Sequence, residues 1–169
     1  LFVALKDRFG QQPWFSWPDP LKHRENDALE KARRDLAREI DRTRFLQFIT
    51  HRQWSRLRAT CESFGVNIIG DIPIYVDHDS ADCWTNPGLF KLDENAMPYV
   101  VAGVPPDYFS ETGQLWGNPL YDWDAIRERG FDWWLARVRR NLTLFDMVRI
   151  DHFRGLVAFW EVPAGEETA

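Results

Sequence analysis

The chain has 169 residues, of which 44% are hydrophobic and 28% charged, and it carries a formal net charge of −5. That length fits one domain of ordinary size, and the acidic balance argues against a nucleic-acid partner, which would need a basic surface. No apolar run approaches the roughly 18 residues that a membrane helix needs. Because the chain starts at Leu1 without a methionine and stops in a predicted loop at Ala169, we expect an internal piece of a longer protein.

Helices are predicted over much of the first third of the chain. Residues 1–8 end one helix, and a loop rich in proline follows. Charged, helix-favouring residues with apolar side chains at helical spacing predict a helix over 28–39 and a longer one over 40–64, which Gly65 ends. Several apolar side chains fall near one side of the longer helix, namely Phe45, Phe48, Ile49, Trp54, Leu57 and Cys61.

A long irregular excursion follows the first predicted strand. The β-branched run from Val66 to Asp71 predicts a buried strand, and Pro73 ends its regular pairing. Residues 77–121 then lack a sustained period, and loops of such length are usually functional.

Short elements are still expected within that excursion. Ser80 is placed to cap a turn of helix that runs through Cys83. Residues 89–104 are typical of a hairpin with its turn at 93–95, and residues 105–119 of an aromatic loop.

The last part of the chain returns to regular structure. Its predicted elements are helices at 122–128 and 131–142, a strand that starts at Met147 and ends at Asp151, and a helical turn at 155–160. Two strands joined through helices indicate a βαβ unit, so the predicted fold class is α/β with a parallel sheet. In β/α barrels, active sites lie at the carboxyl ends of the strands, where Asp71 and Asp151 would lie under the excursion.

The strand that ends at Asp151 carries the most informative pattern. Side chains alternate along a strand, so Arg149 and Asp151 share one face. A cation on that face favours the ionised carboxylate, which could act as a nucleophile. A structural salt bridge at a strand end is the alternative. The adjacent His152 could donate a hydrogen bond to a substrate hydroxyl, or serve only as a structural hydrogen-bonding group.

A second group of acids follows the first strand. Asp77, His78, Asp79 and Asp82 offer oxygen ligands that suit calcium, but they lack the EF-hand spacing and its glycine. A capped turn or an acid that faces a sugar is the better interpretation, and no metal site is expected.

Aromatic residues are unusually abundant, with nine tryptophans in the chain. Trp116, flanked by glycine-containing segments, is a plausible platform for stacking a sugar ring, and Tyr108 and Phe109 in the same loop could gate a site. All three could instead pack the excursion onto the rest of the domain. The tryptophans on predicted helical stretches are most simply core, and these are Trp123, Trp133, Trp134 and Trp160.

The two cysteines, Cys61 and Cys83, do not form a CxxC pattern and suggest no zinc site. They are interpreted as reduced thiols in a cytosolic or plastid-like compartment.

Three long blocks of sequence resemble the 4-α-glucanotransferases, also called amylomaltases or disproportionating enzymes (glycoside hydrolase family 77). The first is GDIPIYV at 70–76 with DSAD at 79–82, the second VAGVPPDYFSETGQ at 101–114 with WGNPLY at 116–121, and the third RIDHFRG at 149–155. The resemblance covers roughly residues 40–163, and three blocks in the right order are far more specific than any one of them.

The resemblance implies a (β/α)8 barrel of the α-amylase superfamily, with residues 1–169 forming part of it and residues 77–121 an inserted subdomain over the active site. It implies transfer of an α-1,4-glucan segment to another glucan or glucose with retention, and without a metal or organic cofactor. Asp151 would be the nucleophile, and Arg149 and His152 would hold it and the sugar in the −1 subsite. The remaining substrate contacts would come from Asp79, Tyr108, Phe109 and Trp116.

A retaining enzyme needs a second carboxyl group, and the family's acid/base glutamate and stabilising aspartate lie on later strands. Glu161, Glu166 and Glu167 follow the nucleophile too closely, since a whole helix must intervene before the next strand. We therefore expect the 169-residue chain alone to lack transferase activity. Two other functions stay open at this point: an α-glucan hydrolase, in which water replaces the acceptor, and a non-catalytic glucan-binding module.

Overall fold

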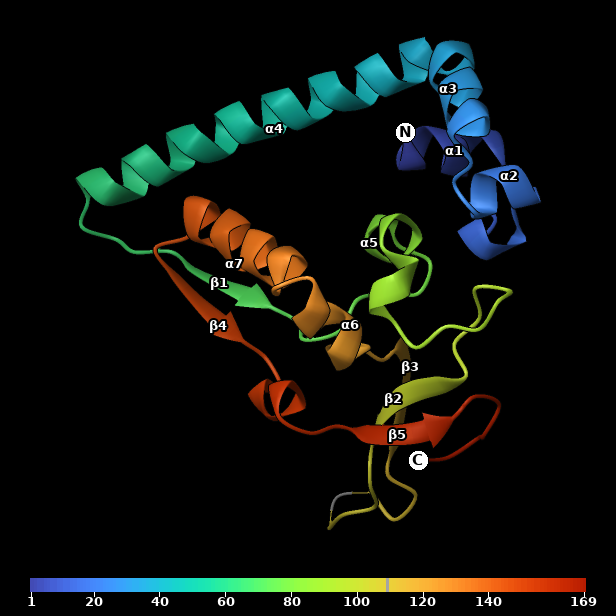
Figure 1. Cartoon of the computed structure of the whole chain (residues 1–169). Helices are drawn as coiled ribbons and strands as arrows, with labels where there is room; N and C mark the ends of the chain where they lie inside the picture. Colours follow the sequence, from blue (N-terminus) through green and yellow to red (C-terminus); the bar gives the residue numbers. More distant parts are fainter. Residues whose placement is uncertain (109) are drawn as a thin grey trace.

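The computed structural model describes residues 1–108 and 110–169, and Figure 1 shows the order of their helices and strands. The first third of the chain is helical, as predicted. Its elements are α1 (Phe2–Arg8), the 3-10 turn η1 (Trp14–Ser16), α2 (Asp19–Lys22), α3 (Asn26–Asp35) and α4 (Ala37–Ser63).

The boundary between the two long predicted helices lies three to four residues earlier than expected, since α3 ends at Asp35 and α4 begins at Ala37. Leu36 leaves the helical conformation, with φ −111° and ψ 23°, and its side chain is buried. The chain therefore turns where an apolar side chain enters the core. The next residues, Ala37 to Glu39, favour a helix and form the first turn of α4. Gly65 follows α4 with φ 66°, a backbone conformation that glycine adopts readily, as its role as a stop predicted.

Tryptophans of the N-terminal segment form the core with residues of the excursion. Trp14 and Trp17 are buried, and Trp17 packs edge-on against Trp84 of α5 (Ala81–Thr85) at 5.5 Å between ring centroids. The indole nitrogens of Trp14 and Trp84 donate to the carbonyls of His78 and Leu21. This cluster fixes the first helices against the start of the excursion.

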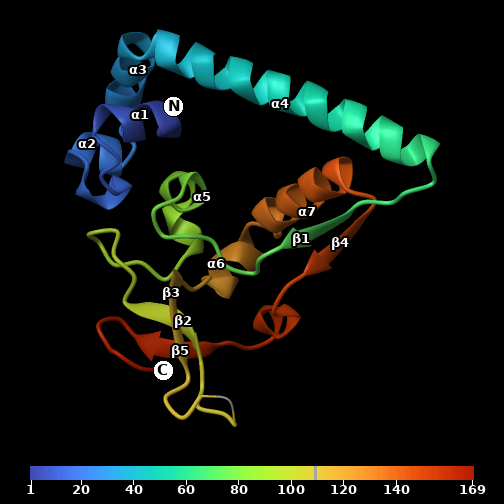
Figure 2. The same ribbon diagram turned by 180° about the vertical axis from the view of Figure 1, so that it is seen from behind.

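Helix α4 extends away from this core, as Figures 1 and 2 show from opposite sides. Much of its apolar side is exposed, since Phe45, Phe48 and Leu57 each keep about half or more of their surface accessible. Trp54 is one of its contacts to the other half of the chain: its indole donates to the carbonyl of Leu144 at 2.9 Å.

The predicted βαβ arrangement is confirmed. Strands β1 (Ile69–Ile72) and β4 (Met147–Ile150) pair in parallel, with Asp71 opposite Arg149. Helices α6 (Trp123–Glu128) and α7 (Asp132–Leu144) precede β4 in the chain, and α7 lies against both strands (Figure 1). A Cβ at Gly70 would overlap the ring of Phe145, so the close approach at this point requires glycine. The strand predicted as buried alternates instead, and Ile69 is 63% exposed.

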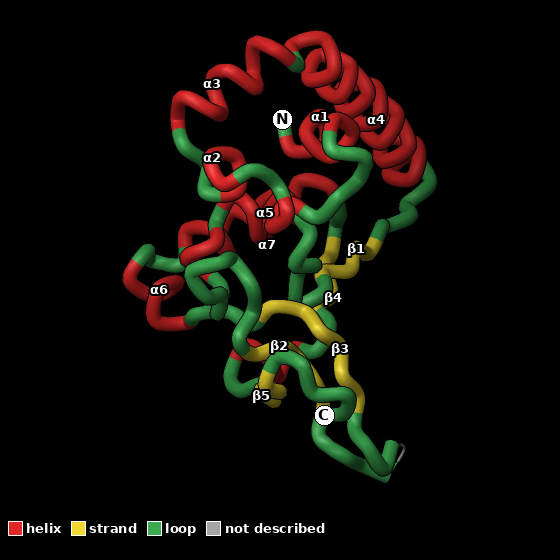
Figure 3. Tube along the Cα trace, turned by 90° about the vertical axis from the view of Figure 1, so that its right-hand side faces the viewer, coloured by secondary structure: helices red, strands yellow, loops and turns green. Residues whose placement is uncertain are grey.

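A second sheet of antiparallel strands was not predicted. Its order is β3-β2-β5, with β2 at Val100–Val104, β3 at Gln114–Pro119 and β5 at Trp160–Pro163. Figure 3 shows the β2–β3 hairpin projecting away from the helices. The predicted hairpin at 89–104 is reduced to a turn closed by one bridge between Leu92 and Pro98, because β2 takes β3 and β5 as its partners.

Two further predictions are wrong in detail. The loop expected at 105–119 contains β3, and the helical turn expected at 155–160 is the 3-10 turn η3 at Phe153–Leu156. Trp160 lies on β5 and is 47% exposed, so it is not a core residue. The other three tryptophans assigned to the core pack there: Trp134 is buried, and Trp123 and Trp133 are partly buried against the same cluster.

Both cysteines are free thiols, as expected, with Cys83 buried in the core. Among the helices of the described residues, none combines the length and the apolar character that crossing a bilayer requires.

Candidate active site

The carboxyl ends of β1 and β4 bring together two carboxylates and one guanidinium. Arg149 Nε donates to Asp71 Oδ1 at 3.1 Å, and Arg149 Nη2 donates to Asp71 Oδ2 at 2.5 Å. The same Nη2 lies 3.7 Å from Oδ1 of Asp151. The arrangement follows from the parallel register, which places Asp71 directly opposite Arg149.

The bidentate contact between Arg149 and Asp71 stabilises the charged forms of both side chains. Hydrogen bonds from Arg149 lower the pKa of the Asp71 carboxyl below its usual value, and the same contact raises the pKa of Arg149. The backbone amide of Asp151 donates to the carbonyl of Ile72 at 3.0 Å, which holds Asp151 beside the end of β1. Its side chain is 64% exposed and therefore accessible to a reactant.

The predicted shared face of Arg149 and Asp151 is confirmed by their ion pair, but Asp71 is the closer partner of the arginine. Sequence reasoning placed Asp71 at a strand end without assigning it a contact. The signal that would have found it is the register of the two strands, which sequence alone does not fix.

His152 follows Asp151 in a left-handed backbone conformation, with φ 47° and ψ 47°. A residue other than glycine in that region costs on the order of 1–3 kcal/mol, so its surroundings must hold it there. The imidazole meets the indole of Trp116 edge-on at 4.9 Å and the ring of Tyr75 at 6.3 Å. The structure thus joins two predicted site residues, His152 and Trp116, that are distant in sequence.

Tyr75 is a site residue that sequence reasoning missed. It is 6% exposed, and its hydroxyl is buried without a hydrogen-bond partner among the described residues. Burial raises the pKa of this phenol to about 12, so it stays neutral. The hydroxyl lies 3.3 Å from the position that a Cβ on Gly155 would occupy. The aromatic character of Tyr75, four residues after Asp71, was the available signal.

The acids at the start of the excursion form a capped turn, one of the two interpretations favoured from the sequence. The amide of Asp79 donates to Asp77 Oδ1 at 2.7 Å, and Ser80 Oγ accepts from the amide of Cys83, which caps α5. Within the described part of the chain, no three His, Cys, Asp or Glu side chains are grouped to hold a metal ion.

Asp79 itself is engaged in structural contacts. Lys6 Nζ lies 2.5 Å from its Oδ2, and the amide of Trp14 donates to its Oδ1 at 3.1 Å. These contacts tie the N-terminal helices to the excursion. The predicted contact of Asp79 with substrate stays a prediction.

Two of the three aromatic residues of the predicted covering loop are described, and they lie in different parts of the β2–β3 hairpin. Trp116 lies on β3, is 37% exposed, and donates from its indole to Gln114 Oε1 at 3.0 Å. Tyr108 lies near the tip of the β2–β3 hairpin and is 97% exposed. Phe109 lies outside the described residues. Of the two described residues, Trp116 is the one whose ring lies beside the strand ends, against His152 and Tyr75.

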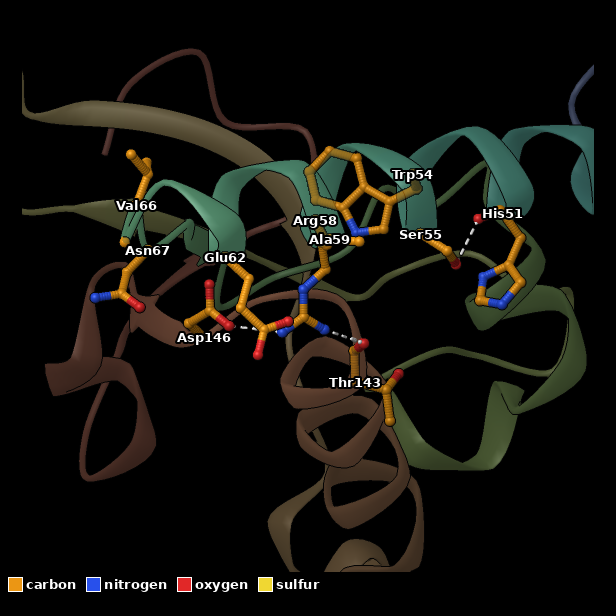
Figure 4. Close-up of a pocket in the computed structure, with 11 residues that line it drawn as sticks. His51, Trp54, Ser55, Arg58, Ala59, Glu62, Val66, Asn67, Thr143 and Asp146 are labelled. Carbon is orange, nitrogen blue, oxygen red and sulfur yellow. Dashed lines mark hydrogen bonds and ion pairs between the residues drawn. The ribbon is translucent and has the colours of Figure 1, made fainter.

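Of two cavities, one borders the candidate active site and the other does not. One of about 350 Å³ is lined by His152, Arg154 and Trp160 together with the end of β2, so it borders the nucleophile block. Another of about 590 Å³ lies between α4 and the start of the parallel strands (Figure 4).

The larger cavity is remote from the chemistry. It is lined by Val66, Asn67 and Asp146, which precede the two strands, whereas Asp71 and Asp151 lie at their carboxyl ends. In Figure 4, Arg58 reaches from α4 to Asp146 and to the carbonyl of Thr143, at 2.6 and 2.8 Å. These contacts hold α4 against the sheet, so the cavity is a gap between packed elements.

Comparison with known proteins adds an independent line. The whole chain, residues 1–169, matches the family described as 4-alpha-glucanotransferase. It is 54% identical to 4-alpha-glucanotransferase from Thermus thermophilus, covering 100% of this chain and 34% of that protein. It is 48% identical to the chloroplastic/amyloplastic 4-alpha-glucanotransferase of Solanum tuberosum, covering 99% of this chain and 29% of that protein.

A solved structure agrees with these relatives. An amylomaltase from Streptococcus agalactiae in complex with acarbose superposes with a TM-score of 0.94 at 42% identity, covering 99% of this chain and 34% of that one. The mixed α/β fold is therefore close to that of an amylomaltase. The chain spans about a third of the length of these proteins.

Proposed function

The chain belongs to the 4-alpha-glucanotransferase family, glycoside hydrolase family 77, and we propose that the protein of which it forms part transfers a segment of an α-1,4-glucan to an acceptor glucan or glucose. The observation that carries this proposal is the position of Asp151. It lies at the carboxyl end of a parallel strand beside Arg149, within a chain that matches the family over its full length.

Asp151 is the nucleophile of this proposal. Its attack on the anomeric carbon forms a bond from a carboxylate oxygen to that carbon, while the bond to the leaving glucan oxygen breaks and that oxygen takes a proton from an acid. The guanidinium of Arg149 lies 3.7 Å from Asp151 Oδ1, so its positive charge faces the attacking carboxylate. The exposed side chain leaves room for the sugar.

Arg149 and His152 serve the same subsite. Arg149 is oriented by its two hydrogen bonds to Asp71, so its charge is fixed in place before a substrate arrives. His152 offers a ring nitrogen to a sugar hydroxyl, with its imidazole packed against Trp116.

The proton donor of the first step must be another carboxyl group. Asp71 is the carboxylate that shares Arg149 with Asp151, and its lowered pKa keeps it ionised rather than protonated. A retaining mechanism needs an acid of raised pKa about 5–5.5 Å from the nucleophile. We place that group in the remainder of the protein, on a later strand of a (β/α)8 barrel of which residues 1–169 form an internal part.

Transfer prevails over hydrolysis when an acceptor sugar occupies the site in the second step and keeps water out. Trp116 supplies an accessible aromatic face beside His152 for that sugar. Residues 77–121 act as the covering subdomain, with Asp79, Tyr108 and Phe109 as further substrate contacts. No metal or organic cofactor takes part in the proposed reaction.

The location of the protein depends on its source. The potato relative is named as chloroplastic/amyloplastic, so we place a plant protein in the plastid and a bacterial one in the cytoplasm.

Product analysis with the intact protein tests the proposed activity. Incubation with maltotriose should yield glucose together with longer maltooligosaccharides, because a maltosyl or glucosyl unit moves between substrate molecules. Release of glucose and maltose without longer products would indicate hydrolysis, and binding without turnover would indicate a non-catalytic glucan-binding module. Either of these results refutes the proposed transfer.

A further inference from the structure

We propose that Arg137 of α7 is a positioning residue for the candidate active site, because it fixes the chain just after β1 and thereby holds Tyr75 against His152. The residue lies on the helix that packs on both parallel strands, and it binds backbone carbonyls after β1 and aromatic rings of the core. The predicted effect on catalysis rests on the proposed function. The predicted effect on the position of Tyr75 rests on the geometry alone.

The guanidinium of Arg137 binds two successive backbone carbonyls. Nη2 donates to the carbonyl of Pro73 at 2.6 Å, and Nη1 donates to the carbonyl of Ile74 at 3.1 Å. These carbonyls directly follow β1, which ends at Ile72, so they have no strand ladder to complete. A planar fork with several donors suits two neighbouring acceptors, whereas a lysine ammonium is a compact charge at the end of a flexible stem.

Tyr121 completes this contact. Its hydroxyl donates to the same carbonyl of Ile74 at 2.6 Å and lies 3.2 Å from Arg137 Nη1. Tyr121 is fully buried, and its pKa is raised by burial, so the phenol keeps its proton for this hydrogen bond. One carbonyl is therefore held from two sides by side chains of different elements.

The guanidinium is itself held in place by aromatic rings. Its carbon lies 5.3 Å from the ring centroid of Trp133 and 5.1 Å from that of Trp134, both within the range of a cation–π contact. Trp134 is buried and Trp133 partly buried, so these rings are fixed by the core. The two rings thus orient the guanidinium of Arg137 toward the end of β1.

The segment that Arg137 fixes leads directly to the site. Tyr75 follows Ile74, and its ring contacts both His152 and Trp116, at 6.3 and 6.1 Å between centroids. His152 holds a left-handed conformation that depends on such neighbours. A shift of Pro73 and Ile74 would move Tyr75 and release His152, whose backbone adjoins Asp151.

Substitutions in the intact protein test the inference. Arg137→Met removes the hydrogen bonds and the cation–π contacts of the guanidinium, and Arg137→Lys keeps the charge but loses the fork. Tyr121→Phe removes the hydroxyl that donates to Ile74 and accepts from Arg137, and it leaves the two hydrogen bonds from Arg137 to the carbonyls available. Arg139→Met is the matched control, because Arg139 is an exposed arginine on the same helix. Maltotriose transfer is measured well below the melting temperature of each variant, and crystal structures of the Arg137 variants are determined.

A positioning role predicts a fall in kcat of about 10- to 100-fold for Arg137→Met, with KM within about twofold, because misplacement of a reacting group by about 1 Å costs that much. Arg137→Lys should recover part of kcat, Tyr121→Phe should fall less than Arg137→Met, and Arg139→Met should match the wild type. In the crystal structure of Arg137→Met, the Tyr75 ring should be displaced from His152.

Two results would overturn the inference. One is wild-type kcat and KM for the folded Arg137 variants with only a lower melting temperature, which is what a merely structural arginine predicts. The other is an unmoved Tyr75 and His152 in the variant structure. If Arg137→Met fails to fold, Arg137→Lys and Tyr121→Phe decide by the same criteria. Absence of transfer by the wild-type protein would refute the proposed function instead, and the structural comparison would still decide the role of Arg137.

Discussion

Arg149 binds Asp71 through two nitrogens, at 3.1 and 2.5 Å, across the only parallel strand pair found among the described residues. The pair is exposed, so solvent screens the attraction between its charges and its contribution to folding stability is small. Its geometric effect is larger, because it decides which way the guanidinium next to Asp151 points. The main effect of this ion pair is therefore to orient Arg149 in the candidate active site rather than to stabilise the fold.

Asp71→Asn in the intact protein should therefore lower kcat by at least about tenfold while leaving the unfolding midpoint nearly unchanged. The amide keeps the shape of the carboxylate but removes the charge that orients Arg149. Maltotriose kinetics and denaturant unfolding measure the two effects. A variant with wild-type kcat would show that the orientation of Arg149 does not depend on this pair.

The same pair predicts a pH dependence of stability. The pKa of Asp71 is lowered in the folded protein from the ordinary value of 3.8, so the pair contributes stability above pH 3.8 that is lost as the pH falls through the folded pKa. The stability difference between wild type and Asp71→Asn should be constant from neutral pH to about pH 5 and shrink below pH 3.8. Urea unfolding across this range checks it, and a difference that grows on acidification would contradict it.

Gly70→Ala should destabilise the protein by about 1–3 kcal/mol, because the new methyl group would overlap the ring of Phe145 behind β1. Gly88→Ala is the matched control: a Cβ there meets no atom within 4 Å, and its effect should stay within about 0.5 kcal/mol. Denaturant midpoints of the two variants give the comparison. Equal midpoints would mean that the ring of Phe145 can move aside.

Tyr75→Phe should keep the fold and should not lower the melting temperature, since it removes a buried hydroxyl that has no partner among the described residues. The ring that supports His152 remains, so kcat should stay close to the wild-type value. Tyr75→Leu removes the ring and should lower kcat at least about tenfold. Thermal unfolding and maltotriose kinetics of both variants separate the effect of the hydroxyl from that of the ring. A large loss of kcat in Tyr75→Phe would show that the hydroxyl, and not the ring, is the group that catalysis needs.

The 169-residue chain by itself should not disproportionate maltotriose, because Asp71 stays ionised and cannot serve as the proton donor beside Asp151. The intact protein, assayed at equal molar concentration, is the positive control. Longer maltooligosaccharides formed by the pure chain would show that it contains a complete catalytic pair.

The parallel strand pair and its helices could be predicted because their signals are local. The β-branched run before Asp71 and the helical period of residues 131–142 each indicate their element without reference to the rest of the chain. The position of Asp151 at a strand end followed from the same reasoning. Its role came from the family resemblance, and stays a proposal.

The antiparallel sheet could not be predicted in the same way, because its strands depend on partners distant in sequence. Gln114–Pro119 contains a glycine and a proline and has little strand preference of its own, yet it pairs with Val100–Val104. Trp160 was predicted on a helix, but it lies on a strand because it pairs with Gly103, which is distant in sequence.

Contacts across elements were also beyond the sequence. The partner of Arg149, the ring contact between His152 and Trp116, and the structural ties of Asp79 all depend on register and on the path of the excursion. Tyr75 lies within the GDIPIYV block, but the block assigns it no contact, and Arg137 lies outside all three blocks. Their roles are revealed by the hydrogen bonds from α7 to the chain after β1 and by the ring contact of Tyr75 with His152.

The central claim is that Asp151 is the nucleophile, and Asp151→Asn in the intact protein tests it most directly. The amide preserves the size of the side chain but cannot form the glycosyl ester, so kcat for maltotriose should fall by more than about 1,000-fold, while maltooligosaccharide affinity measured by calorimetry should stay within about threefold. Turnover within about tenfold of the wild type would contradict the account.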